Sequence, residues 1–214
     1  MTELFLAVFL ISTAIHLYGS LKQDRRLRNL TKPFLLAALF GFYYFTAERV
    51  LPEILLALFF SWLGDILLMP AGVKWFTAGG ISFMISHGFF IAGYCKDIVF
   101  SSLSSVVIVP LALLFTGLTI FIFSKLKAFL PKALFYPMFL YLLINGTMNC
   151  FAILRMISMP GAAALVTCIG AVLFFISDST LFFVRFKKNG KLKTHFWVML
   201  TYSIGELLII IGLL

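Results

Sequence analysis

The sequence predicts an all-α integral membrane protein: eight transmembrane helices, joined by short loops, form a single bundle over residues 1–214. Three observations support this prediction. Hydrophobic residues make up 62% of the chain and charged residues 12%, which is more apolar surface than a water-soluble core can bury. The mean hydropathy is +1.09. Runs such as 34–45 and 162–176 are apolar on every side, which is typical of helices in lipid and excludes the alternating pattern of a membrane barrel.

Each predicted span is a mostly apolar segment, and a crossing takes about 20 such residues in a helix. The first segment follows Glu3 and no basic cluster, so we interpret it as a spanning helix and not as a cleaved signal peptide. The second and third are short for a full crossing. The expected spans are 4–21, 31–47, 52–69, 75–94, 102–123, 132–154, 161–186 and 195–214.

The basic residues are concentrated in alternate predicted connectors. Fourteen of the 17 Lys and Arg residues lie in the first, third, fifth and seventh connectors, and the other three are Arg49, Lys96 and Arg155. Because Lys and Arg stay on the cytoplasmic side, both termini are expected to be non-cytoplasmic. The net charge of +9 is therefore attributed to orientation and to contact with membrane lipids, and not to nucleic acid. The short loops favour a bacterial inner membrane, and no oligomeric state is predicted.

Ionisable side chains inside a span are costly, so they are candidates for function. With a rise of about 1.5 Å per residue, Asp65 and Asp178 lie in the cytoplasmic halves of their helices. His87 and Glu206 lie near or beyond the midplane, and Lys32 lies at the mouth of the second span. We expect a polar chamber that opens towards the cytoplasmic leaflet, with the two aspartates facing each other near its mouth. The neutral polar candidates are Tyr136, Asn145, Asn149 and Tyr202.

These residues also have structural explanations. Asp65 could be a solvated helix-end carboxylate paired with Lys74, and His87, Glu206 or Asn149 could hydrogen-bond a neighbouring helix. The three histidines, one of them in a loop, do not make a zinc site, and the three scattered cysteines have no metal-binding or disulfide spacing. No metal and no cofactor is therefore expected.

Five short motifs occur in order along the chain. They are Thr31-Lys32-Pro33, LGDILL at 63–68, GISF with SHG and Tyr94 within 80–94, GAVLF with ISD within 170–178, and Tyr202 with GELLI at 205–209. Together they resemble the YhhN-like lysoplasmalogenase family over nearly the whole length of the chain. One position departs from the family pattern, which usually has a neutral polar residue where this chain has Glu206.

The resemblance implies an intramembrane hydrolase that cleaves the vinyl-ether bond of lysoplasmalogens, which are single-chain lysophospholipids. The products would be a fatty aldehyde and glycerophosphocholine or glycerophosphoethanolamine. The family pattern carries over to Lys32, Asp65, His87, Ser177 and Asp178.

The implied chemistry suits these residue types. A vinyl ether hydrolyses when its β-carbon is protonated to give an oxocarbenium ion, to which water adds. Two carboxyl groups in different surroundings can divide the roles of proton donor and charge stabiliser. We therefore predict these roles for Asp65 and Asp178 in either order, a water-orienting or proton-relay role for His87, and a phosphate contact for Lys32. The other predicted substrate-binding residues are Ser177, Tyr136, Asn149, Tyr202 and Glu206.

Two other classes of function fit the same residues. In a proton- or cation-coupled transporter, Asp65, Asp178 and Glu206 would form an ion path. A non-enzymatic lipid-binding protein would retain lipid without turnover and would tolerate Asp→Asn substitutions.

Overall fold

The computed structural model describes residues 1–187 and 195–214, and this part of the chain contains eight α-helices and three short 3-10 helices. The α-helices are α1 (Thr2–Leu21), α2 (Arg25–Thr46), α3 (Pro52–Leu67), α4 (Val73–Cys95), α5 (Ser105–Leu126), α6 (Phe135–Ser158), α7 (Ala162–Phe186) and α8 (Phe196–Ile211). The 3-10 helices are η1 (Phe100–Ser102), η2 (Lys127–Phe129) and η3 (Lys132–Leu134).

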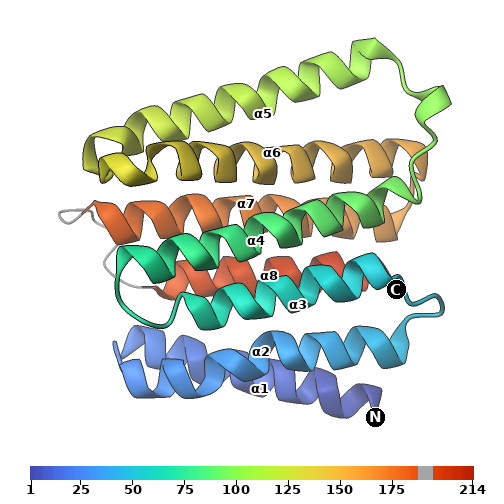
Figure 1. Cartoon of the computed structure of the whole chain (residues 1–214). Helices are drawn as coiled ribbons and strands as arrows, with labels where there is room; N and C mark the ends of the chain where they lie inside the picture. Colours follow the sequence, from blue (N-terminus) through green and yellow to red (C-terminus); the bar gives the residue numbers. More distant parts are fainter. Residues whose placement is uncertain (188–194) are drawn as a thin grey trace.

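The helices form a bundle in which consecutive helices run in opposite directions (Figure 1). The α1–α2, α3–α4 and α5–α6 connections therefore lie at one end of the bundle, and both chain termini lie at the other. The closest partners are α1 with α2, α3 with α4, and α7 with α8, while α6 packs against α4, α5 and α7. Helix α5 is at the edge of the bundle, beside α6 (Figure 1).

Five of the described helical segments are long and apolar enough to cross a membrane, and they correspond to α1, α4, α5, α6 and α7. The edge helix α5 exposes large apolar side chains, with Val106 77% and Leu113 67% exposed. Helices α3 and α8 have 16 residues each, which is roughly 24 Å at the α-helical rise and shorter than the hydrocarbon layer. The all-α prediction with eight helices is confirmed for the described residues, and the apolar helices identify a multi-pass integral membrane protein.

Helix α2 begins six residues before the predicted span because Asp24 caps it. The Asp24 carboxylate accepts hydrogen bonds from the backbone N–H groups of Arg26 and Leu27 at 2.8 and 3.2 Å, which satisfies donors that a helix start leaves unpaired. Pro33 consequently lies inside the helix, and its carbonyl accepts a hydrogen bond from Trp62 Nε1 at 2.9 Å. The earlier start adds Arg25, Arg26 and Arg28 to the first turns of α2.

Pairs of glycines bring the backbones of two helix pairs into close contact. A Cβ atom at Gly170 would lie 2.6 Å from the carbonyl oxygen of Gly205, and one at Gly205 would lie 2.9 Å from that of Gly170. Likewise, a Cβ at Gly64 would lie 3.2 Å from the Gly79 carbonyl oxygen. Any larger residue would push α7 from α8, or α3 from α4. Asp65 directly follows one of these glycines, so its position depends on this contact.

Arg155, which the sequence assigned to a connector, lies instead in the last turn of α6 and joins several elements at the end that carries the termini. Its guanidinium donates to the Asp97 carboxylate at 2.7 Å, to Thr167 Oγ1 at 2.9 Å and to the Gly212 carbonyl at 3.2 Å. Arg155 therefore links α6 to the segment after α4 through an ion pair, and to α7 and the end of α8 through hydrogen bonds.

Candidate active site

A cavity of about 100 Å³, hereafter the inner cavity, lies inside the bundle. Polar and basic residues from α2, α3, α6, α7 and α8 share its wall with apolar side chains. Lys32, Asp65, Tyr141, Ser177, Asp178, Arg185, His195 and Tyr202 are the polar residues, and Leu68, Phe76, Gly80, Phe83, Leu181, Phe182, Val198 and Met199 are the others.

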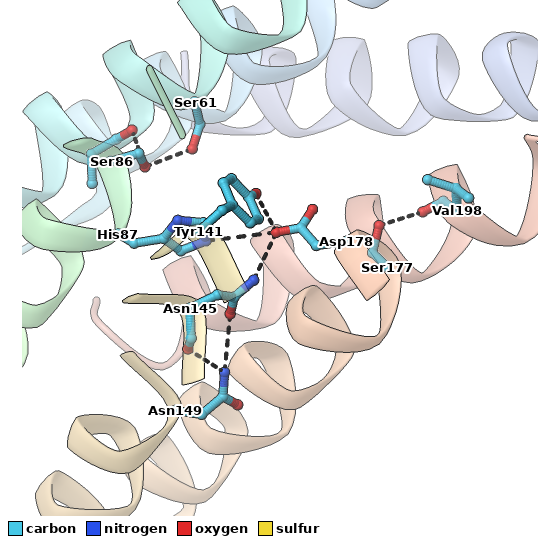
Figure 2. A network of polar contacts seen from close by, with 10 residues as sticks. Ser61, Ser86, His87, Tyr141, Asn145, Asn149, Ser177, Asp178 and Val198 are labelled. Atoms are coloured by element: carbon cyan, nitrogen blue, oxygen red, sulfur yellow. Dashed lines mark hydrogen bonds and ion pairs between the residues drawn. The ribbon is translucent and has the colours of Figure 1, made fainter. Parts of the chain in front are cut away.

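Asp178 is held by neutral hydrogen-bond donors from α6 (Figure 2). Its Oδ2 accepts hydrogen bonds from the Tyr141 hydroxyl at 2.5 Å and from Asn145 Nδ2 at 2.7 Å. Asn149, one turn further along α6, donates to the Asn145 carbonyl oxygen at 3.0 Å and to Asn145 Oδ1 at 3.2 Å. Asp178 is 5% exposed, so the carboxyl group is buried within this network with one oxygen fixed.

Asp65 has a different environment, because a cation lies against it. Lys32 Nζ is 3.1 Å from Asp65 Oδ1, and the Tyr202 hydroxyl donates to Asp65 Oδ2 at 2.9 Å. The partner of this aspartate is therefore Lys32 from α2, and not Lys74 as one structural explanation held. The two aspartates, from α3 and α7, line the same cavity, one with a charged partner and the other with neutral ones.

His87 lies behind Asp178 and does not line the inner cavity. Its Nε2 is 3.8 Å from Asp178 Oδ2, which is beyond hydrogen-bond length (Figure 2). The ring is fully buried and packs edge-on against Tyr141 and Phe174, with ring centroids 5.5 and 5.0 Å away. In the described part of the chain neither ring nitrogen has a hydrogen-bond partner.

Four of the remaining predicted site residues are buried in the bundle. Ser177 and Tyr202 line the inner cavity, and Ser177 Oγ donates to the Val198 carbonyl at 2.9 Å. Asn149 and Glu206 are buried deeper and do not line it. Among the described residues neither carboxylate oxygen of Glu206 has a hydrogen-bond partner.

The structure does not bring Tyr136 to the inner cavity. This side chain is 87% exposed in the first turn of α6 and does not line the inner cavity. Tyr141 occupies the site instead. Five residues turn a helix by about 140° beyond a full circle, so the two tyrosines lie on different faces of α6.

The role of the α6 face in holding Asp178 was not predicted from the sequence. Tyr141, Asn145 and Asn149 recur every four residues, which places them on one face of the helix. This i, i+4, i+8 polar stripe on an otherwise apolar helix is the signal that would have added Tyr141 to the two asparagines.

A second cavity of about 300 Å³, hereafter the outer cavity, adjoins the inner one and shares Lys32, Leu68, Arg185, His195 and Met199 with it. The α3–α4 connection contributes to its wall, so it lies at the bundle end opposite the chain termini (Figure 1). Burial, together with the cations Arg28 and Lys32, lowers the pKa of His195, just before α8, to about 4, so this imidazole is neutral at neutral pH. The other residues of the wall are His16, Arg25, Arg28, Asn29, Met69, Pro70 and Ala71.

Apolar outer surfaces around a buried polar cluster define a polytopic membrane protein with an intramembrane polar site. The chain belongs to the YhhN family, whose sequence model matches residues 27–213. Comparisons with curated proteins and with solved structures gave no significant match. Within residues 1–187 and 195–214, no group of three or more His, Cys, Asp or Glu side chains is placed to hold a metal ion.

Proposed function

We propose that this protein is an intramembrane hydrolase that cleaves the vinyl-ether bond of lysoplasmalogens to a fatty aldehyde and a glycerophospho-base. The family is associated with lysoplasmalogenase activity. The main structural support is that Asp65 and Asp178 line one cavity in unlike surroundings. A carboxyl pair of this kind can provide both a proton donor and a negative charge, which are the two groups that acid-catalysed vinyl-ether hydrolysis requires.

We assign the proton donor to Asp178 and the stabilising carboxylate to Asp65. The Lys32 ammonium provides a counter-charge for Asp65 at 3.1 Å, which suits a carboxylate that stays ionised through the reaction. The hydrogen-bond donors at Asp178 are neutral and both reach Oδ2. Because that oxygen is occupied, Oδ1 is the atom that would carry the transferable proton.

The proposed reaction has three steps. Asp178 transfers its proton to the β-carbon of the vinyl ether, and the resulting oxocarbenium ion lies near the Asp65 carboxylate. A water molecule adds to the cationic carbon and returns a proton to Asp178. The hemiacetal then breaks its carbon–oxygen bond to give the aldehyde and the glycerol hydroxyl. Tyr141 and Asn145 would fix the Asp178 carboxyl, and His87, one layer behind, would position that group without touching the substrate.

Aldehyde release by the purified protein tests the proposal. The substrate is a lysoplasmalogen, and the control is the saturated ether analogue, which has no double bond to protonate. Aldehyde should form from the vinyl ether and not from the analogue. If folded, detergent-stable protein released no aldehyde, the proposed hydrolase function would be wrong.

A route for the hydrocarbon tail runs between α4 and α6 in this proposal. A small apolar cavity of about 20 Å³ lies there and shares Phe76, Gly80, Tyr141 and Phe182 with the inner cavity. Ile81, which is 47% exposed, also lines it, so this route leads from the aspartates towards the lipid-facing surface. We propose that the tail lies in this route while the vinyl ether reaches the aspartates.

The substitution Gly80→Leu should block this route without unfolding the protein. A Cβ at Gly80 would have one neighbouring atom within 4 Å, Tyr141 Cδ2 at 4.0 Å. A leucine side chain is therefore accommodated there, and it would occupy the space of the route. Displacing about two methylene groups of the tail should raise KM about tenfold for a long-chain substrate, and less for a short-chain one.

Gly88→Leu is the matched control, because it lies on the same helix and a Cβ there would meet nothing within 4 Å. Steady-state kinetics over a series of chain lengths measures both variants. Equal effects of the two substitutions, or an effect independent of chain length, would contradict the tail route.

We further propose that the bundle end with the cavities faces the cytoplasm and that both termini lie outside it, in the inner membrane of a bacterium. The distribution of Lys and Arg supports this orientation. With the three native cysteines replaced by Ala, Glu48→Cys should react with a membrane-impermeant maleimide in intact cells, and Lys74→Cys should react only after permeabilisation. The reverse labelling pattern would invert the orientation.

A further inference from the structure

Cationic side chains line the outer cavity, and no carboxylate is among the described residues of its wall. Arg25, Arg28 and Lys32 from α2 and Arg185 from α7 lie around its volume of about 300 Å³. Asp65 lines the inner cavity and is paired with Lys32.

The three arginines have no carboxylate partner within the described part of the chain. The ion pairs found there involve Lys32, His87, Lys96 and Arg155, and none involves Arg25, Arg28 or Arg185. The Nε atom of Arg28 is buried and has no hydrogen-bond partner among the described residues. The Arg185 guanidinium lies 5.8 Å from the centre of the ring of Phe76, a residue that lines the inner cavity. Like charges gathered around one cavity repel each other unless an anion lies between them.

An oxyanion with several acceptor atoms fits such a site best. Guanidinium groups present paired N–H donors that match phosphate oxygens, and Arg–phosphate contacts are frequently bidentate. The neutral imidazole of His195 and the amide of Asn29 add uncharged hydrogen-bonding groups to the wall. A phosphate group therefore matches the charge and the donors of the outer cavity.

The position of the outer cavity relative to the aspartates indicates what carries the phosphate. Lys32 and Arg185 line both cavities, so an anion in the outer cavity lies next to the inner one. In a single-chain glycerophospholipid, the three-carbon glycerol unit separates the phosphate from the ether oxygen. A lipid with its ether at the aspartates would therefore extend its phosphate into the outer cavity.

We infer that the outer cavity is a phosphate-binding site for the headgroup of a single-chain ether phospholipid, and that it favours headgroups of net negative charge over choline or ethanolamine. This inference rests on the proposed function for the placement of the ether. The preference follows from the wall, which offers cations to a phosphate monoester and no carboxylate to the ammonium of a zwitterionic headgroup.

Equilibrium binding of saturated ether lipids tests the site without hydrolysis. The ligands are an alkylglycerophosphate, the matching alkylglycerophosphocholine and the alkylglycerol without phosphate, each added to the whole protein in an uncharged detergent. We expect the phosphate monoester to bind most tightly, the choline diester more weakly and the alkylglycerol most weakly. Equal affinities for the three lipids would overturn the inference.

Two arginine variants and one control test whether the phosphate lipid binds in the outer cavity. Arg28→Gln and Arg185→Gln should each weaken alkylglycerophosphate binding by about tenfold, because each loses a charge-assisted contact. Arg26→Gln is the matched control, since Arg26 is exposed on the same turn of α2 and does not line the cavity. Melting curves show whether each variant is folded, and the two arginines serve as independent tests. Unchanged affinity in both folded variants would overturn the site.

Inorganic phosphate separates the two sources of the ligand. Weak competition with alkylglycerophosphate supports a lipid headgroup, whereas binding as tight as that of the lipid would assign the site to free phosphate and overturn the lipid inference. The outcome is distinct from that of the aldehyde assay. Charge-ordered binding without aldehyde release would retain this site and remove the hydrolase, and aldehyde release with charge-independent binding would do the reverse.

Discussion

Replacing Asp178 with Asn should lower kcat for lysoplasmalogen hydrolysis by about 10²–10⁴-fold, the usual contribution of a general acid. The amide has the shape of the carboxyl group, and its oxygen can still accept hydrogen bonds from Tyr141 and Asn145, so the local structure is kept. What the amide lacks is a proton acidic enough to transfer to carbon. KM should change little, because the group acts on the transition state more than on the bound lipid.

Steady-state aldehyde release and thermal melting measure this prediction together. Asp97→Asn is a suitable control, because it makes the same chemical change at the bundle end that carries the termini. There, Arg155 keeps hydrogen bonds to Thr167 and Gly212. Retained activity in folded Asp178→Asn protein would remove Asp178 from the reaction.

Replacing Asp65 with Asn should reduce kcat by about 10²–10³-fold, a loss typical for removing one preorganised electrostatic contact to a developing charge. The oxocarbenium ion is positive, so an anion nearby stabilises the transition state more than the neutral substrate. This substitution should also lower the melting temperature, because the Lys32 ammonium, 3.1 Å from Asp65, loses its counter-charge inside the bundle.

A double variant separates these two effects of Asp65. In Lys32→Gln/Asp65→Asn the unpaired charge is gone, so the melting temperature should recover while the activity stays low. If activity recovered along with stability, Asp65 would act by neutralising the charge of Lys32 and not by stabilising the oxocarbenium ion. Melting curves and aldehyde release, measured on the same protein preparations, distinguish these outcomes.

The helices could be predicted from the sequence because lipid requires long apolar segments with internally paired backbones. The boundaries were less predictable where a local contact sets them. Helix α2 starts at Arg25 because Asp24 caps it, although the charged first turns do not resemble a membrane span. The sequence predicted that α3 is short for a membrane crossing. It did not predict this for α8, because the predicted span 195–214 included residues outside the helix.

Placement in depth was more predictable than placement around a helix. The helical rise places Asp65, Asp178 and Lys32 at similar depths, and all three line the inner cavity. The face a residue occupies is harder to predict, because a helix that is apolar all round gives no amphipathic pattern to orient it. Tyr136 was therefore chosen where Tyr141 faces the cavity. His87 lies behind Asp178 and does not line the inner cavity.

The glycine contacts between α7 and α8 and between α3 and α4 affect how the site responds to changes in the surrounding lipid bilayer. Gly170 and Gly205 leave no room for side chains, so the spacing of α7 and α8 is fixed by main-chain contact. The Tyr202–Asp65 hydrogen bond then ties α8 to α3. A change in bilayer thickness should therefore be absorbed by tilting of outer helices such as α5, while the two carboxyl groups keep their register. Turnover should accordingly depend little on the thickness of the host membrane.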